Sequence, residues 1–391
     1  MKILFVNFTK MVGDSGGVAK VACVFANEMI QRGHEVSMIY SDEKEGPFFF
    51  SVSDSFHCYN VKQNEQGNFI KFPWYMKLYR EVVRVFDKKK AHDINRDFDD
   101  KYLTKNLERL VSEIKPDIIV SYQIESTVHL LWNLKIDIPV VTMSHEAQRN
   151  HYDEKETYAL EHSVAYQVLT NGFRWQINKV LPKVNCITIG NAVETTDKVV
   201  NLSNKKQRYK IMSVGRLNSN HKRPHLLLQA FAKIAVDFPD WDLELWGSKD
   251  NKIYVKQLET IISRNRLENR VSLCGTTDKV YDKLAQADIF AFPSAYEGFP
   301  LAMTEAMNAG LPVIGYKFCA GVNELIEDGV NGYLCEDGVD AFVDALRKLM
   351  ADQDLRIRMG KVAREKMRQY EPKVIWDQWE KLLQTITKEK V

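Results

Sequence analysis

The sequence predicts an α/β protein made of two doubly wound domains, each with a parallel sheet covered by helices. Short apolar segments of strand length alternate with longer segments whose apolar residues recur at helical spacing, which is the pattern of parallel strands joined by crossover helices. This alternation stops in a polar run at residues 195–208 and then starts again. At 391 residues the chain is also too long for one ordinary core.

The amino-acid composition argues against several classes of function. The chain is 45% hydrophobic and 27% charged, as in soluble globular proteins, and its net charge of +2 gives no indication of a nucleic-acid partner. Six cysteines without a CxxC pair argue against a zinc site or redox motif and predict a reduced, cytosolic protein. No apolar run is long enough for a signal peptide or a membrane span, so neither is expected.

The first elements form a βαβ unit. An apolar strand at 2–7 is followed by Gly16 and Gly17, a helix that ends at Gly33, and a strand at 36–40. Ligands of such folds gather outside the carboxyl ends of the strands, and glycine lets the backbone approach them closely. The Gly-Gly turn fits tight packing as well as ligand contact, and it lacks the third glycine of the dinucleotide-binding fingerprint.

Residues 74–90 combine a helical apolar stripe with a basic flank next to Trp74, Tyr75 and Tyr79. Such a segment can lie on an anionic bilayer. The alternative is a helix packed on its own domain with a solvated charged face. Two DxD sequences, in 97–100 and 240–242, are interpreted as surface carboxylates, because the first lies in a charged helical run and the second just before a strand.

Strands at 117–121 and 138–143 come next, and His145 follows the second one directly. It would therefore lie at the carboxyl end of a strand, where an imidazole can serve as donor or acceptor. A structural and a functional role are both open for this residue. After strands at 165–169 and 186–189 we place the end of an N-terminal domain at 1–194 and a linker at 195–207.

A C-terminal domain is predicted at 208–371. Its strand at 209–214 leads into a loop that carries Arg216 and Lys222, a planar fork and a compact point charge suited to phosphate oxygens. Helices at 224–236, 252–264 and 278–286 alternate with strands at 241–246 and 271–274.

The stretch 288–315 holds the clearest site signal. A strand at 289–292 leads to Glu297 and Gly298 in a loop, Pro300 opens a helix, Glu305 lies about one turn into it, and a strand follows at 313–315. A helix N-terminus attracts anions such as phosphate. The two carboxylates suit sugar hydroxyls on either side of that phosphate.

Helices at 339–350 and 354–368 follow, and residues 372–391 form a last helix. Its aromatic face must cover another part of the protein; this face consists of Ile375, Trp376, Trp379, Leu383 and Ile386.

Together these motifs resemble the retaining nucleotide-sugar glycosyltransferases of family 4, which have the GT-B fold. The likeness rests on the Glu-x7-Glu pair, the Arg216 and Lys222 loop, the Gly-Gly turn, His145 and the IGNAV segment at 189–193. It implies two Rossmann-like domains that face each other across a cleft. The C-terminal domain would hold the donor and the N-terminal domain the acceptor, and the last helix would cross back to the first domain.

The resemblance also implies roles. Arg216 and Lys222 would grip the diphosphate, Glu305 the ribose hydroxyls, and Glu297 would lie beside the donor phosphate and sugar. His145 would touch the transferred sugar, so the expected catalytic residues are Glu297, His145, Arg216 and Lys222. The remaining donor-binding positions are those of the backbone around the phosphate, namely Gly16, Gly17, Gly298, Phe299, Pro300 and Leu301.

Three positions depart from the family pattern. Arg223 replaces a common glycine, so it would add charge or face solvent. Residues 318–326 replace a glycine-rich stretch that faces the donor sugar, and Glu146 stands where Asp often follows the histidine.

The predicted activity is transfer of a hexosyl or N-acetylhexosaminyl group from a nucleoside diphosphate sugar, expected to be a UDP-sugar, to a hydroxyl of a glycan or lipid-linked acceptor with retention. The pathway would be cell-surface polysaccharide or glycolipid synthesis, without a metal or other cofactor, in the cytoplasm with peripheral contact at the inner membrane face. A nucleotide-sugar epimerase or phosphorylase of the same fold and a non-catalytic nucleotide-binding scaffold are the alternatives. A dinucleotide oxidoreductase is disfavoured by the glycine spacing.

Overall fold

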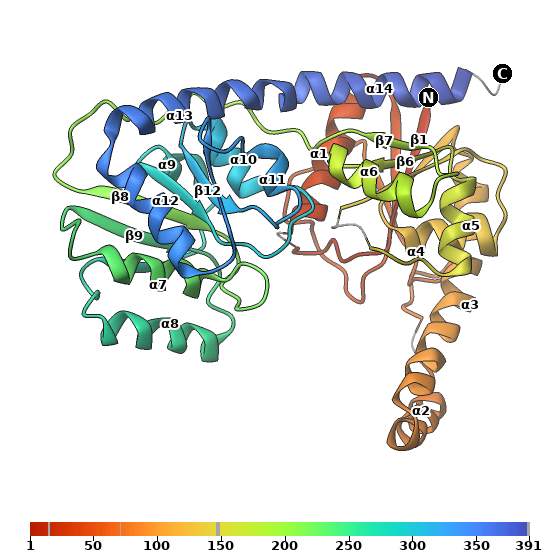
Figure 1. The fold of residues 1–391 in the computed structure, drawn as a ribbon. Helices are drawn as coiled ribbons and strands as arrows, with labels where there is room; N and C mark the ends of the chain where they lie inside the picture. The colour runs from red at the N-terminus through yellow and green to blue at the C-terminus, as the bar shows by residue number, and fades with distance from the viewer. Residues whose placement is uncertain (15, 71, 146–148, 389–391) are drawn as a thin grey trace.

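The computed structural model describes residues 1–14, 16–70, 72–145 and 149–388. Two parallel sheets, each flanked by helices, lie side by side and are bridged by a long C-terminal helix (Figure 1). The two doubly wound domains and the returning helix predicted from the sequence are confirmed. The exact domain boundaries stay a prediction, although no helix or strand lies between residues 188 and 209.

The N-terminal sheet has the strand order β3-β2-β1-β4-β5-β6-β7. Its strands are β1 Lys2–Asn7, β2 Glu35–Tyr40, β3 His57–Asn60, β4 Ile118–Ser121, β5 Val140–Met143, β6 Ala165–Val168 and β7 Cys186–Thr188. Its helical elements are α1 Gly17–Gln31, α2 Trp74–Phe86, α3 Lys88–Ile114, α4 Ile124–Thr127, the π-helical turn η1 Val128–Asn133, α5 Glu154–His162 and α6 Asn171–Val180. The order reverses between β1 and β4, and ligands of open parallel sheets bind at such a switch point.

The C-terminal sheet has the order β10-β9-β8-β11-β12-β13, with its switch point between β8 and β11. The strands are β8 Tyr209–Val214, β9 Trp241–Trp246, β10 Val271–Gly275, β11 Ile289–Phe292, β12 Val313–Tyr316 and β13 Gly332–Cys335. The helices are α7 Pro224–Ile234, α8 Lys252–Arg264, α9 Val280–Leu284, α10 Leu301–Asn308, α11 Val322–Leu325, α12 Val339–Ala351 and α13 Gln353–Met367, followed by the 3-10 turn η2 Arg368–Tyr370 and α14 Pro372–Lys388.

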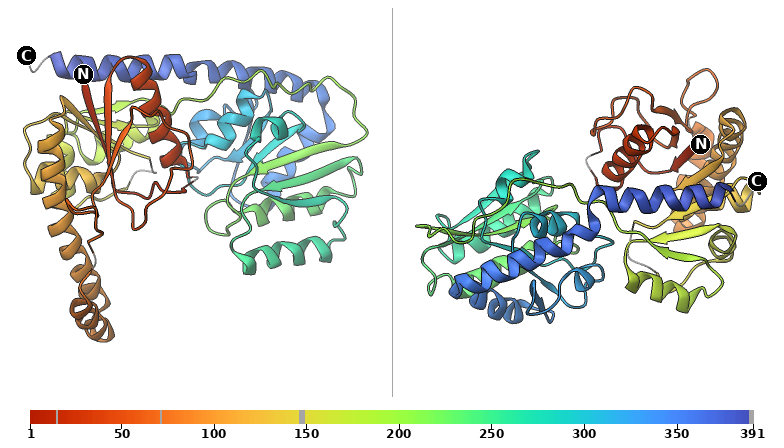
Figure 2. Two further views of the ribbon diagram at one scale, coloured as in Figure 1. Left: turned by 180° about the vertical axis from the view of Figure 1, so that it is seen from behind. Right: turned by 90° about the horizontal axis from the view of Figure 1, so that it is seen from above.

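The returning helix α14 packs on α1 of the N-terminal domain, as its aromatic face predicted. Trp376 stacks on Phe25 with ring centroids 5.0 Å apart, and Trp379 lies 4.8 Å from the same ring. Arg32 adds ion pairs to Asp377 and Glu380. Figure 2 shows α13 running along the C-terminal domain and α14 continuing from it over the N-terminal domain, so the end of the chain ties the two halves together.

Helices α2 and α3 differ from the prediction. The segment 74–90 is not one helix, because Asp87 ends α2 and its side chain caps α3 by accepting from the Lys90 N–H at 2.9 Å. The two helices form a hairpin that projects from the N-terminal domain on the side opposite α14 (Figures 1 and 2). Helix α2 packs on α3 of its own domain, as the second interpretation held, but no residue of α2 is buried and its apolar face stays exposed, so a membrane role stays a prediction.

The interpretation of the two DxD sequences as surface carboxylates is correct for Asp97, which is exposed. Asp100 is instead half-buried, 3.4 Å from His129 Nε2. Asp242 forms ion pairs with Arg208 and Arg270.

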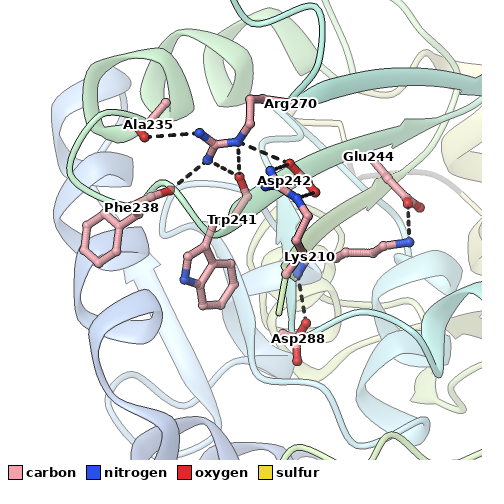
Figure 3. Close-up of polar contacts among 9 residues, drawn as sticks. Lys210, Ala235, Phe238, Trp241, Asp242, Glu244, Arg270 and Asp288 are labelled. Atoms are coloured by element: carbon pink, nitrogen blue, oxygen red, sulfur yellow. Dashed lines mark hydrogen bonds and ion pairs between the residues drawn. The ribbon is translucent and has the colours of Figure 1, made fainter. Parts of the chain in front are cut away.

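Arg270 also donates to the backbone carbonyls of Phe238 and Trp241, which fixes the start of β9 (Figure 3). This network lies at the amino end of β9 and serves folding. It is on the sheet edge opposite the predicted donor site.

Candidate functional site

Two loops that follow neighbouring strands meet at the carboxyl edge of the C-terminal sheet. The loop after β8 carries Arg216 and Lys222, and the loop after β11 carries Glu297. Pairing of β8 with β11 puts both loops side by side, and the Ala295 N–H donates to the His221 carbonyl at 2.8 Å. Two motifs separated by about 80 residues in the sequence therefore become one site.

Lys222 and Glu297 form a buried ion pair. Lys222 Nζ lies 2.5 Å from Glu297 Oε1 and 4.8 Å from the centre of the Phe292 ring. Burial alone would raise the pKa of Glu297, but His221, Lys222 and Ser294 together outweigh it and hold the pKa below its ordinary value of 4.5. Glu297 is therefore ionised near neutral pH and fixes the position of the lysine ammonium group.

Arg216 lies exposed at the start of the same loop. Within the described ranges, its guanidinium has no hydrogen bond or ion pair to a protein group. The ammonium group of Lys222 has three hydrogen-bond donors, and one of them donates to Glu297. Both cations therefore keep donors for an anion.

The expectation that Arg223 faces solvent is wrong, because its side chain is only 14% exposed, and the expectation that it adds charge to the site stays a prediction. Its guanidinium stacks over Tyr316 and Phe318 at 4.7 and 5.2 Å and pairs with Asp337 at 3.1 Å. The backbone of Arg223 takes a left-handed conformation, with φ at 46°, where the loop turns into α7. The strain that glycine would avoid at this position is offset by these contacts.

The N-terminus of α10 lies beside the Gly-Gly turn of the other domain. Pro300 precedes the helix rather than starting it, with ψ at 80°, and accepts from the N–H groups of Met303 and Thr304. A Cβ on Gly17 would lie 3.7 Å from Leu301 Cδ1. The first turns of α1 and α10 therefore face each other across the domain boundary, as the resemblance implied for a phosphate site.

Glu305 meets a cation that the sequence analysis did not select. Lys20 of α1 places its Nζ 3.1 Å from Glu305 Oε1, and the glutamate side chain is 14% exposed. Burial raises the pKa of Glu305, which Lys20 partly counteracts and Glu194 reinforces. The proposed ribose carboxylate is thus held by a lysine from the opposite domain.

A second carboxylate joins the domains. Glu324 of α11 accepts from the backbone N–H groups of Asn171 and Gly172 at 2.9 and 2.7 Å, at the N-terminus of α6 in the other domain. A helix N-terminus favours a negative charge. A Cβ on Gly172 would come within 2.5 Å of Glu324 Oε1, so a larger residue there would displace the glutamate carboxylate. Glu324 therefore clasps the cleft closed in this structure.

The segment 318–326, which departs from the family pattern, supplies this clasp. Gly321 has φ at 79°, and a Cβ there would lie 2.9 Å from the Gly298 carbonyl oxygen. The segment thus packs directly on the loop that carries Glu297. Glu146, the third departure, lies outside the described residues.

His145 lies in the N-terminal domain, at the end of β5. It stacks on Tyr122 with centroids 5.3 Å apart, and burial lowers its pKa to about 4. Its Nε2 is buried, and among the described residues it has no hydrogen-bond partner. The ring lines a cavity together with Gln123, Arg149 and Tyr152. A neutral imidazole that lines such a cavity can donate to or accept from a hydroxyl.

Sequence reasoning missed Lys20 and Glu324. A lysine one turn into a helix opposes the helix dipole, so its position just after Gly16 and Gly17 was a usable signal. Glu324 gave none, because nothing in its own segment indicates a contact with α6. In the described part of the chain, no cluster of three His, Cys, Asp or Glu side chains could hold a metal ion. A search of the same residues finds no helix long and apolar enough to cross a membrane.

Comparisons with known proteins agree with this geometry. Residues 194–366 match the family model of the glycosyl transferases group 1. An uncharacterized glycosyltransferase of Haemophilus influenzae is 25% identical over 394 residues, which cover 96% of this chain and 98% of the relative. The family match spans both loops of the site and Glu305.

Two solved structures share the whole fold. Sucrose-phosphate synthase from Thermosynechococcus elongatus superposes with a TM-score of 0.77 at 17% identity and covers 98% of both chains. TarM of S. aureus, in a complex with fondaparinux, alpha-GlcNAc-glycerol and UDP, gives a TM-score of 0.74 at 16% identity over 98% of this chain and 100% of its own. Residues 194–366 of this protein therefore match the group 1 glycosyl transferases, and the chain as a whole has the GT-B fold of these solved structures.

Proposed function

We propose that the chain transfers a hexosyl or N-acetylhexosaminyl group from a UDP-sugar to a hydroxyl of a glycan or lipid-linked acceptor, with retention at the anomeric carbon. The observation that carries the proposal is the convergence of Arg216, Lys222 and the α10 N-terminus on one edge, with Glu305 one turn further along α10. The UDP in the TarM complex supports uracil as the donor base. Synthesis of cell-surface polysaccharide or glycolipid at the cytoplasmic face of the membrane is the setting that fits such an acceptor.

The chemistry is leaving-group stabilisation. As the sugar departs, negative charge builds on the β-phosphate, and donors fixed in advance in a closed site stabilise that charge well. Glu297 holds the ammonium of Lys222 at 2.5 Å, so little reorganisation is needed when the diphosphate forms. Arg216 adds a second, mobile cation.

Retention follows a front-face route in this proposal. The departing phosphate oxygen takes the proton of the acceptor hydroxyl on the same side from which the leaving group departs. The Cβ-free backbone of Gly16 and Gly17 leaves the acceptor side of the phosphate open. His145, neutral at physiological pH because its pKa is about 4, would hydrogen-bond the transferred sugar.

Glu305 would accept from both ribose hydroxyls. Because Lys20 already neutralises this buried carboxylate, ribose binding need not desolvate a free charge. Lys20 is then a positioning residue that keeps Glu305 ionised and couples donor binding to the approach of α1.

Donor panels and product analysis test this function. We expect UDP-sugars to raise the melting temperature more than GDP- or ADP-sugars, since only ligands bound by the folded state stabilise it. Incubation with a UDP-sugar alone, and then with phosphate, separates the rivals: an epimerase gives a new or free sugar and a phosphorylase a sugar phosphate. Tight UDP binding without transfer to any acceptor would favour a scaffold.

The proposal includes metal-independent transfer, because two cations and a helix N-terminus face the diphosphate. Full activity in EDTA is the expected result. Loss of activity that added Mg²⁺ or Mn²⁺ restores would contradict this part of the proposal.

A further inference from the structure

Helix α2 exposes an apolar face with no partner in the described structure. Its exposed apolar side chains lie within one arc of the helix, and Trp74, Val85 and Phe86 are 77%, 80% and 85% exposed. The rest of this apolar face consists of Tyr75, Leu78, Tyr79 and Val82. Met76, Arg80 and Val83, on the other side of α2, are the less exposed positions. Such a continuous apolar face on a projecting element indicates an interaction surface.

Charge identifies the partner. Helix α2 carries Lys77, Arg80 and Arg84 against Glu81 alone, which leaves +2 on 13 residues. The whole chain has a net charge of +2, so the other residues together are neutral. The basic charge is concentrated beside the apolar face, with Tyr and Trp side chains of the kind that lie at membrane interfaces.

A cavity at the base of the hairpin extends the same chemistry. Lys62, Lys77 and Arg80 line it together with Phe72 and Tyr102. One carboxylate, Glu43, lies 3.5 Å from Lys62. Cations beside aromatic rings suit a phosphate headgroup with an attached hydrocarbon portion.

We propose that the α2–α3 hairpin docks this protein on an anionic membrane surface, with the apolar face of α2 at the acyl boundary and its basic residues among the lipid phosphates. Amphipathic helices with basic polar faces bind bilayers in this way. The hairpin stands clear of the rest of the chain on the side opposite α14 (Figures 1 and 2), so a flat surface can reach it. The proposal deepens the proposed function, on which it rests only for the lipid-linked acceptor.

A second copy of the chain fits less well. A second copy would cover the apolar face of α2 but would offer no complementary charge to its basic residues. Two facing copies would also bring their Lys77 and Arg84 rows together. An anionic bilayer is complementary to both the apolar and the basic side chains.

Vesicle flotation tests the proposal. The full chain should float with vesicles of phosphatidylglycerol and phosphatidylcholine, poorly with phosphatidylcholine alone, and less as salt increases. Replacing Trp74, Leu78, Val85 and Phe86 together by Ser should lower the bound fraction by about tenfold or more, since lipid contact scales with buried apolar area.

A matched variant controls for surface hydrophobicity in general. Trp175, Val236 and Ile253 are 68%, 90% and 77% exposed elsewhere on the protein, and their joint replacement by Ser should leave flotation unchanged. Both variants change exposed side chains only, so both should melt near the parent temperature.

The proposal would be overturned if the parent chain did not float, or if the variant with Ser at Trp74, Leu78, Val85 and Phe86 (the hairpin variant) floated as well as the parent. It would also be overturned if the only effect of the hairpin variant were the loss of a dimer in light scattering. Hydrolysis of the UDP-sugar by the hairpin variant reports separately on the donor site. A chain that hydrolyses donor but does not float contradicts only the membrane inference.

Discussion

Glu324→Gln tests whether closure of the cleft depends on a single carboxylate. The change keeps the side-chain shape but removes the charge that accepts from Asn171 and Gly172 at the N-terminus of α6. Hydrogen bonds to charged groups contribute about 1.5–3 kcal/mol, and neutral ones about half as much. We expect the closed state to lose about 1.5 kcal/mol, which is about a tenfold shift toward open forms.

Two measurements follow that shift. The radius of gyration from small-angle scattering should increase, and kcat/KM for the UDP-sugar should fall by up to about tenfold, because transfer needs the closed cleft. The thermal unfolding of the protein should change little, since neither domain core is touched. Glu336→Gln is the matched control, because that exposed carboxylate pairs only with Lys317 of its own domain in the described contacts. Unchanged scattering together with unchanged kcat/KM in Glu324→Gln would refute the clasp.

Four other substitutions probe the site. Arg216→Ala and Lys222→Ala should each lower kcat/KM by about 10²-fold or more; the melting temperature should change little in Arg216→Ala and fall in Lys222→Ala, which leaves the buried Glu297 carboxylate without its lysine partner. Full turnover in both would exclude a diphosphate site here. Lys20→Gln should raise the pKa of Glu305 further, so that KM for the donor rises as pH falls from 8 to 5 more steeply than in the parent; parallel pH profiles would argue against the pairing. The pKa of Glu297 in the folded protein lies below the ordinary value of 4.5. The stabilisation from its ion pair is therefore complete above pH 4.5 and is lost as pH falls through the folded-state pKa. Glu297→Gln should accordingly flatten the acid limb of stability measured by urea unfolding, and an unchanged limb would count against that ion pair.

The fold could be predicted well from the sequence where periodicity was strong. All strands of both central sheets that are continuously apolar, such as β1 and β11, were found within one or two residues. The edge strands β3 and β13 were missed, since HCYN and GYLC are short and half-buried. Helix α3 was predicted only as a charged helical run around residues 97–100, and its extent was missed, because its charged residues fall on all sides and hide the stripe that packs on the sheet.

The site could be predicted where its chemistry is local. The loop with Lys222 and the loop with Glu297 each carried a readable motif, and strand order brought them together. Lys20 and Glu324 act across the domain boundary; the position of Lys20 just after the Gly-Gly turn was a signal that could have been used, whereas nothing in the segment of Glu324 indicates its contact with α6. The sequence could not show that α2 is exposed to solvent, because an amphipathic pattern is the same whether its apolar face packs on protein or not.

The binding of UDP compared with uridine tests the diphosphate site most directly. Titration calorimetry should show UDP binding at least about a hundredfold tighter than uridine to the parent chain, since charge-assisted contacts from two cations form only with the diphosphate. This difference should shrink in Arg216→Ala and Lys222→Ala, while uridine affinity stays the same. Equal affinity for UDP and uridine, or a difference that survives both substitutions, would contradict the assignment of this edge of the sheet as the donor site.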